Sequence, residues 1–215
     1  SAYDMATTFT LPRDGPTFIE SVFYRADELI RSGIWEGIRP TRLRRWRANF
    51  SDELERYFSA CVLDALIYRS TAQTEALLAH LWSSVIPATA RARGILVEGS
   101  ANWLDILRSR QAALGDIRIV PVVTPEQLTK SGYVIARLLE KKLRVADKYI
   151  VAADTLTRDA ASVIVFIDDF LGSGTQFHKF ARRFGLKALS QQHKCIYAPL
   201  AAHSSGVKTM RRAYP

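Results

Sequence analysis

A run of five apolar residues that ends in two adjacent aspartates constrains this chain more than any other feature. Val163–Ile167 is apolar on both faces, which is typical of a central strand in a parallel sheet. Asp168 and Asp169 follow directly, and a turn of small residues, Gly172–Gly174, precedes a helical pattern. Strand, acidic pair, glycine turn and helix in this order predict a ligand site at the carboxyl end of a parallel strand.

The pattern of apolar residues divides the chain into two parts. Residues 1–93 predict helices only, whereas residues 94–215 alternate strand and helix. The β-branched run 117–123 predicts a strand, and Cys195–Ala202 predicts another, which lies at a sheet edge or ends at Pro199. We therefore expect an α/β fold whose parallel, Rossmann-like sheet is preceded by an all-helical N-terminal segment.

Three amphipathic helices are expected in the N-terminal part, each with its apolar stripe in a core. The first is expected over residues 18–34, and the second from Ser51 or Asp52, where Glu55 completes a capping-box pattern. In the third helix, Pro87 is expected to end or kink the helix. The stripe that the second helix should bury comprises Leu54, Tyr57, Phe58, Cys61, Val62, Ala65 and Leu66.

Charge and cysteine content narrow the class of protein. The net charge of +9 is compatible with an acidic partner, such as a phosphate-bearing metabolite, nucleic acid or an acidic protein. Cys61 and Cys195 form no CxxC pair, and the four histidines have no metal-ligand spacing. No apolar stretch is long enough for a membrane span, and no signal-peptide pattern opens the sequence. A cytoplasmic protein is expected, and its oligomeric state is left open.

The turn after the acidic pair has the composition of a phosphate-binding loop. Gly172 and Gly174 allow close backbone approach, and Ser173 and Thr175 add hydroxyl donors. Free amides at the start of the following helix point to the same place. A Walker A loop would need a lysine here, and a dinucleotide fingerprint would need a third glycine where Phe177 stands. The alternative without a ligand is a glycine-rich turn with two capping acids.

The segment Val163–Gln176 resembles the phosphoribosyl-pyrophosphate motif of type I phosphoribosyltransferases. The resemblance implies that Asp168 and Asp169 grip the ribose hydroxyls. From their chemistry alone, the two carboxylates can accept hydrogen bonds from sugar hydroxyls or hold Mg²⁺ through water. The 5′-phosphate would then bind to Gly172, Ser173, Gly174, Thr175 and Gln176. A pyrophosphate loop would fall at residues 124–132, where an ordinary helix start is the alternative. Its expected contacts are Lys130, Ser131 and Gly132.

Two departures from that family's pattern bear on activity. Gln176 stands where the family usually has Thr or Ser, and Gly172 stands where members acting on 6-oxopurines have Asp. The Phe-Leu-Gly-Ser-Gly form also resembles a divergent group of bacterial conflict and anti-phage systems, in which such a domain serves as effector or sensor. Three hypotheses stay open: an enzyme that uses phosphoribosyl pyrophosphate, a non-catalytic nucleotide sensor, and a nucleic-acid binder whose loop contacts backbone phosphate.

A cluster of arginines surrounds a tryptophan in the helical part. Arginine with an interleaved aromatic ring is typical of surfaces that bind phosphates and stack on bases. The alternatives are a solvated helix face and a surface for a partner protein. The cluster comprises Arg39, Arg42, Arg44, Arg45, Trp46 and Arg47.

Overall fold

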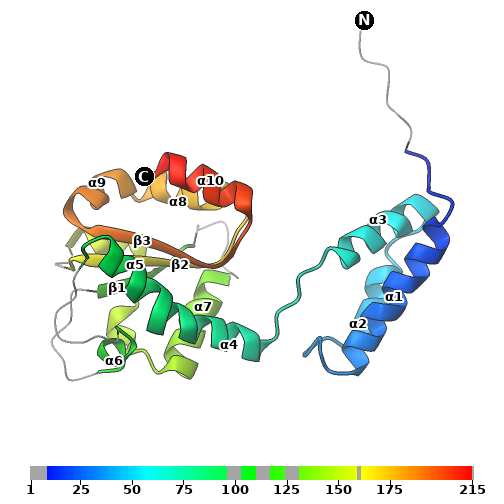
Figure 1. Cartoon of the computed structure of the whole chain (residues 1–215), viewed down its shortest axis with the longest axis horizontal. Coiled ribbons are helices and arrows are strands. Elements are labelled where there is room, and N and C mark those ends of the chain that lie inside the picture. The colour runs from blue at the N-terminus through cyan, green and yellow to red at the C-terminus, as the bar shows by residue number, and fades with distance from the viewer. Residues whose placement is uncertain (1–8, 96–102, 110–116, 124–130, 159–160, 215) are drawn as a thin grey trace, which may run out of the picture. The chain divides into compact units, whose positions relative to one another are not determined.

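The structure, a computed structural model, shows a chain that forms two compact units (Figure 1). We refer to residues 1–73 as the helical unit and to residues 74–215 as the α/β unit, and we describe each by itself. The residues that the structure describes are 9–95, 103–109, 117–123, 131–158 and 161–214.

The helical unit contains the helices α1 (Gly15–Arg31), α2 (Pro40–Arg47) and α3 (Glu53–Asp64). The capping box expected at the start of α3 is confirmed: Asp52 Oδ1 accepts from the Glu55 amide at 2.8 Å. The Ser51 amide in turn donates to Glu55 Oε2 at 2.7 Å. The apolar face of α1 is buried as its helical period predicts. The core of the unit consists of Ile19, Val22, Phe23, Ala26, Ile30, Trp35, Leu43, Ala60 and Leu63.

The face that α3 buries differs from the predicted one. Ser59, Ala60 and Leu63 are buried, and α1 packs against α3. Small side chains on this face let the two helices approach closely, and the Ser59 hydroxyl is satisfied because it donates to the Arg56 carbonyl at 2.7 Å. The prediction from the apolar period alone is therefore wrong for this helix. Its exposed apolar residues are Leu54, Phe58 and Val62, followed beyond the helix by Leu66.

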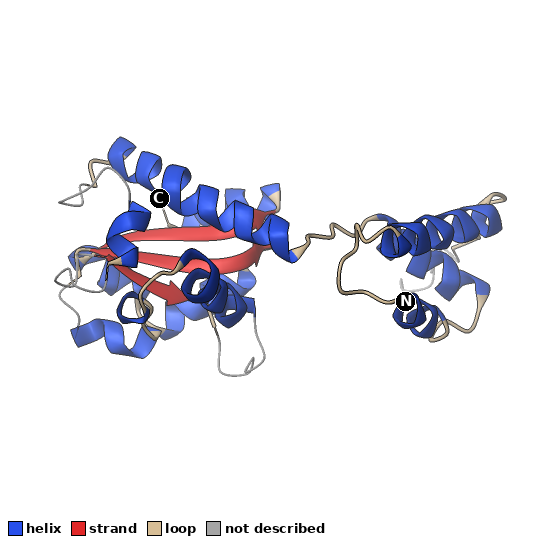
Figure 2. Ribbon diagram, turned by 90° about the horizontal axis from the view of Figure 1, so that it is seen from below, coloured by secondary structure: helices blue, strands red, loops and turns tan. Residues whose placement is uncertain are grey.

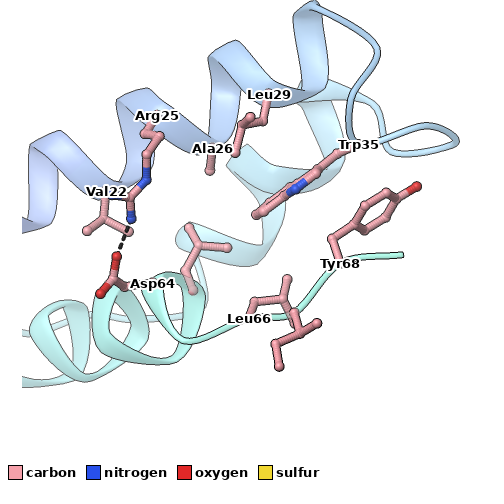
Figure 3. Close-up of a pocket in the computed structure, with 10 residues that line it drawn as sticks. Val22, Arg25, Ala26, Leu29, Trp35, Asp64, Leu66 and Tyr68 are labelled. Carbon is pink, nitrogen blue, oxygen red and sulfur yellow. Dashed lines mark hydrogen bonds and ion pairs between the residues drawn. The ribbon is translucent and has the colours of Figure 1, made fainter. Parts of the chain in front are cut away.

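A pocket of about 450 Å³ lies between α1, α3 and the segment that follows α3 (Figure 3). Arg25 of α1 and Asp64 of α3 form an ion pair at one side of it. At the other side the rings of Trp35 and Tyr68 stack with their centroids 5.6 Å apart. The ion pair connects α1 with α3, and the ring contact connects the segment after α3 with the loop between α1 and α2.

A long helical segment leads into the α/β unit. It runs without interruption through α4 (Thr71–His80), the π-helix η1 (Leu81–Val85) and α5 (Ile86–Ala92). Pro87 therefore does not end the helix. Proline cannot donate the usual backbone hydrogen bond, and the wider π-helical turn lies directly before it.

The segment from α4 to α5 belongs to the core of the sheet. Leu78, Trp82 and Ile86 are nearly or fully buried in the same cluster as Val163 and Val165 of the sheet. The compact units consequently divide between residues 73 and 74, whereas the sequence pattern changes from helical to alternating near residue 93.

Three parallel strands form the described sheet in the order β1-β2-β3: β1 (Ile117–Pro121), β2 (Val163–Leu171) and β3 (Lys194–Ala202). β2 is central, and its Val163 pairs with Ile117 of β1 and Lys194 of β3. β3 does not stop at Pro199 but continues to Ala202. It is an edge strand of the described sheet, which is one of the two outcomes expected from the sequence.

Helices cover both faces of the sheet, which explains why β2 is apolar on both sides (Figures 1 and 2). On one face, α7 (Ser131–Leu143) packs with the α4–α5 segment. On the other face lie α8 (Thr175–Arg183), α9 (Leu186–Gln192) and α10 (Ser204–Ala213). The remaining short helices are α6 (Trp103–Arg108), η3 (Asp147–Tyr149) and η4 (Ala153–Arg158).

The winding of the chain reverses between β1 and β2. After α7, Ile150 forms a parallel bridge to Ile119 of β1, and the Val151 amide donates to the Ile119 carbonyl at 2.9 Å. The chain therefore first extends the sheet beyond β1, and then returns to form β2 and β3 on the other side of β1. A doubly wound sheet has its switch point at such a reversal, and ligands bind at the carboxyl ends of the strands there.

Trp82→Ala should lower the free energy of unfolding of the α/β unit by about 3–5 kcal/mol, because the fully buried indole leaves a cavity in the sheet core. Val85→Ala is the matched control in the same turn, since Val85 is 42% exposed and its truncation should cost less than about 0.5 kcal/mol. Hydrogen exchange of the β2 amides measures the change in the free energy of unfolding for both variants. Equal protection in the two variants would contradict the assignment of α4–α5 to this core.

Candidate functional site

The end of β2 places its two aspartates on opposite faces of the sheet. Successive side chains of a strand alternate, and Asp168 lies on the face of Phe166, which α8 and α10 cover. The Asp168 side chain is 1% exposed, whereas Asp169 is half-buried. Of the predicted pair, Asp169 is thus the more accessible carboxylate.

Asp168 is held by two hydrogen bonds. The Tyr197 hydroxyl donates to Oδ2 at 3.1 Å, and the Asp169 amide donates to Oδ1 at 3.0 Å. Tyr197 stands on β3, and its ring stacks on Phe177 of α8 with centroids 3.8 Å apart. Burial raises the pKa of the Tyr197 hydroxyl, so this group stays a donor.

Desolvation raises the pKa of Asp168 to about 7. The hydrogen bond from Tyr197 acts in the opposite direction, and the neighbouring Asp169 carboxylate adds to the rise. A carboxyl group whose pKa is raised to about 7 at the end of a central strand marks a candidate functional site.

The loop after β2 has the backbone that its glycines suggest. Gly174 has φ +90° and directly precedes α8, which begins at Thr175. Positive φ is strained for residues with a side chain, so glycine is required here. The hydroxyl oxygens of Ser173 and Thr175 lie 2.9 Å apart, and both residues are exposed. The loop therefore presents two hydroxyls beside the N-terminus of a nine-residue helix.

Helix α10 is seated directly on this loop. The His203 amide donates to the Leu171 carbonyl at 2.8 Å. Gly206 is buried against the loop. Glycine is needed at this position because a side chain would overlap the Gly172 carbonyl oxygen. A Cβ at Gly174 would lie 2.6 Å from Cε of Met210. The loop conformation is thus fixed from two sides, by β2 and by α10.

The expected pyrophosphate loop falls largely outside the described residues, Lys130 included. Ser131 is the first residue of α7, and Gly132 follows it in the helix. Gly132 is buried, and a Cβ there would lie 2.8 Å from the Val122 carbonyl oxygen. This glycine lets α7 start close to the end of β1, a packing role that needs no ligand.

Several residues at the site carried no usable signal in the sequence. Tyr197 reaches Asp168 only through the β2–β3 register, which pairs Phe166 with Tyr197. Phe170 is 50% exposed, although it lies near the end of the central strand β2. Gly206 did leave a signal, since glycine inside a helix is unfavourable unless close packing requires it. The predicted cluster Arg42, Arg44, Arg45, Trp46 and Arg47 lies in the helical unit.

A comparison with known protein families shows to which family the chain is related. The profile of the family PRTase-CE matches residues 43–215. The chain belongs to the PRTase-CE family. Searches of curated proteins and of solved structures each gave no match. The resemblance to phosphoribosyltransferases noted at residues 163–176 agrees with this membership, which supports a phosphoribosyltransferase-like protein.

Two further observations concern metal and membrane. In the described part of the chain, no three or more His, Cys, Asp or Glu residues gather closely enough to hold a metal ion. Nor does any helix there have the length and apolar character that crossing a bilayer requires.

Asp168→Asn should stabilise the protein at pH 8 by roughly 2–4 kcal/mol, with the gain vanishing near pH 4. The reason is that a raised folded-state pKa makes the folded state hold its proton more tightly, so stability falls as pH rises from about 4 to about 7. Denaturant unfolding at several pH values measures this. Asp154→Asn, at an exposed carboxylate, is the control, and equal pH profiles for the two variants would contradict the burial of an ionisable Asp168.

Proposed function

We propose that the α/β unit binds a ligand with a 5-phosphoribosyl group, such as phosphoribosyl pyrophosphate or a nucleotide, through the loop Asp168–Gln176. The observation that carries this proposal is the place of the loop. It follows the central strand at the point where the winding reverses, and it opens the N-terminus of α8. Membership of the PRTase-CE family supports the same class of ligand.

The described sheet would be part of a larger Rossmann-like core. Two helices, α7 and α8, begin where adjacent parallel strands β1 and β2 end. Their N-termini and free amides would therefore lie beside the same crevice. An anionic ligand with two phosphate groups matches this arrangement, one phosphate at each helix start.

Each loop residue has a role in this proposal. The amides of residues 172–176 and the hydroxyls of Ser173 and Thr175 would hold the 5′-phosphate. Asp169, the more accessible acid, would accept hydrogen bonds from ribose hydroxyls. Asp168, held by Tyr197, would position the end of β2 and keep Asp169 in place through its hydrogen bond to the Asp169 amide.

A magnesium ion fits this site only with the help of the substrate. Asp168 is almost fully buried, so Asp169, the more accessible acid, is the carboxylate that a metal ion could approach. Mg²⁺ commonly keeps several waters and binds through one or two carboxylates plus substrate phosphates. The ion would thus be held mainly by the ligand, with Asp169 contacting it through water, and it would supply positive charge to a leaving pyrophosphate.

Binding of phosphoribosyl pyrophosphate with Mg²⁺, measured by calorimetry, tests the proposal. Asp169→Asn should weaken binding about ten- to a hundredfold, because hydrogen bonds to a charged acceptor contribute about 1.5–3 kcal/mol. Glu140→Gln removes an exposed carboxylate on α7 and should bind like the parent. A folded parent that binds neither phosphoribosyl pyrophosphate nor a nucleotide would overturn the proposal.

Whether the protein also catalyses a reaction is a separate question, which the same mixture of protein and ligand can answer. Transfer would rely on positioning and charge stabilisation, and the Gln176 and Gly172 departures favour a binding role. Phosphorus NMR of the bound mixture distinguishes the two, since an enzyme releases pyrophosphate and a sensor leaves the ligand intact. We expect intact ligand.

A defence role, which the resemblance to conflict systems implies, is the further part of this proposal. Bacteria that express this protein with Asp169→Asn should lose the protection against phage that the parent protein gives in a plaque assay, because the variant no longer senses its ligand. Protection equal to that of the parent would exclude ligand binding at this loop from such a role.

A further inference from the structure

The described side chains of α2 separate into an inner and an outer set. Leu43 is buried, and Trp46 packs its ring against Phe23 of α1 and Phe50, with centroids 6.1 Å and 5.0 Å apart. Arg47 joins this inner set, because its guanidinium lies 4.6 Å from the centroid of the Phe23 ring and pairs with Glu20. The outer set is exposed and consists of Arg39, Arg42, Arg44 and Arg45, which we call the α2 arginine face.

The α2 arginine face differs from the other arginines of α1 and α2 because none of its members forms an ion pair among the described residues. Arg25 pairs with Asp64, as Figure 3 shows, and Arg31 pairs with Asp27. No ion pair of the described residues involves the α2 arginine face, and the sequence has no acid between residues 37 and 51. Four like charges so close together repel each other. The acids that line a hollow with Arg44, Glu20 and Asp27, are paired with Arg47 and Arg31 instead.

Two hollows border this face. One, of about 540 Å³, is lined by Arg44, Arg47 and Arg56 together with Ser51 and Phe50. The acids beside it are already engaged: Glu55 accepts from Ser51, and Asp52 accepts from the Glu55 amide. Arg47 is already paired with Glu20, so Arg44 and Arg56 are the guanidinium groups of this hollow that suit an oxyanion such as a phosphate.

The second hollow, of about 260 Å³, shares Arg44 and Arg47 with the first and adds an exposed aromatic side chain. Its two acids, Glu20 and Asp27, each pair with an arginine of the same hollow. Tyr24 of α1 lines it and is 70% exposed, although most large aromatic rings of this unit are partly or fully covered. An exposed ring next to arginines is a platform on which a nucleic-acid base can stack.

We propose that the α2 arginine face, with these two hollows, binds single-stranded nucleic acid. Backbone phosphates contact Arg42, Arg44 and Arg45 and enter the hollow at Arg56, while a base stacks on Tyr24. A single strand fits better than a duplex, because only unpaired bases offer their faces to a ring. Arginine also suits this role, since every basic Lys or Arg residue before residue 130 is arginine, which can bind phosphate in two-pronged fashion.

Fluorescence anisotropy of the full chain with a labelled oligothymidine of about 20 nucleotides tests the proposal, over about 50–200 mM salt. Arg42→Gln/Arg44→Gln/Arg45→Gln should weaken binding at least about tenfold at low salt and reduce the slope of log affinity against log salt by about 2. The slope falls because the triple variant no longer neutralises three phosphates of the single strand, so fewer counterions are released on binding. Tyr24→Ala should weaken binding while leaving the salt slope unchanged, because it removes stacking and no charge.

The matched control is Arg91→Gln/Arg93→Gln/Lys187→Gln, which removes the same charge from exposed positions of the α/β unit. It should bind the oligonucleotide like the parent. Equal weakening of binding in both triple variants would mean attraction by net charge only and would overturn the proposal. A parent that does not bind, or that prefers a duplex of the same length, would overturn it as well. Oligouridine in place of oligothymidine shows whether RNA or DNA binds more tightly.

Discussion

The structure of the α/β unit depends on one strand that is buried on both faces. β2 exchanges backbone hydrogen bonds with β1 on one side and β3 on the other, and helices cover it above and below. Such a strand has no freedom to shift register, because each residue is fixed by neighbours in two directions. This constraint sets the position of Asp168 and of the loop that follows β2 in the sequence.

The sequence is informative where a pattern is local. The apolar run at residues 163–167, the helix from Ser131 and the capping box at Asp52 are each set by neighbours in the chain, and each is present in the structure. The positive φ of Gly174 likewise follows from a loop too tight for a side chain. Local rules also explain why the glycine turn predicts the start of a helix.

The sequence is uninformative where a partner comes from far along the chain. The hydrogen bond from Tyr197 to Asp168 requires the register of β3, which no local pattern specifies. The apolar period predicts the wrong buried face for α3 because α1 packs on small residues, so period and burial disagree. Pro87 predicts an end or a kink of the helix, and of these two the end is excluded, because the helix continues beyond the π-helical turn.

The contact between Gly206 and Gly172 has a consequence for the order in which the site matures during synthesis. The two backbones are in direct contact there with no side chain between them, so each restricts the conformation of the other. Ribosomes build the chain from its N-terminus, and domains begin to fold as they emerge. α10 follows β2, the loop and α8 in the chain, so it leaves the ribosome after all of them. The loop would therefore acquire its final shape only after α10 has emerged, and a nascent chain could not present a finished phosphate cradle before then.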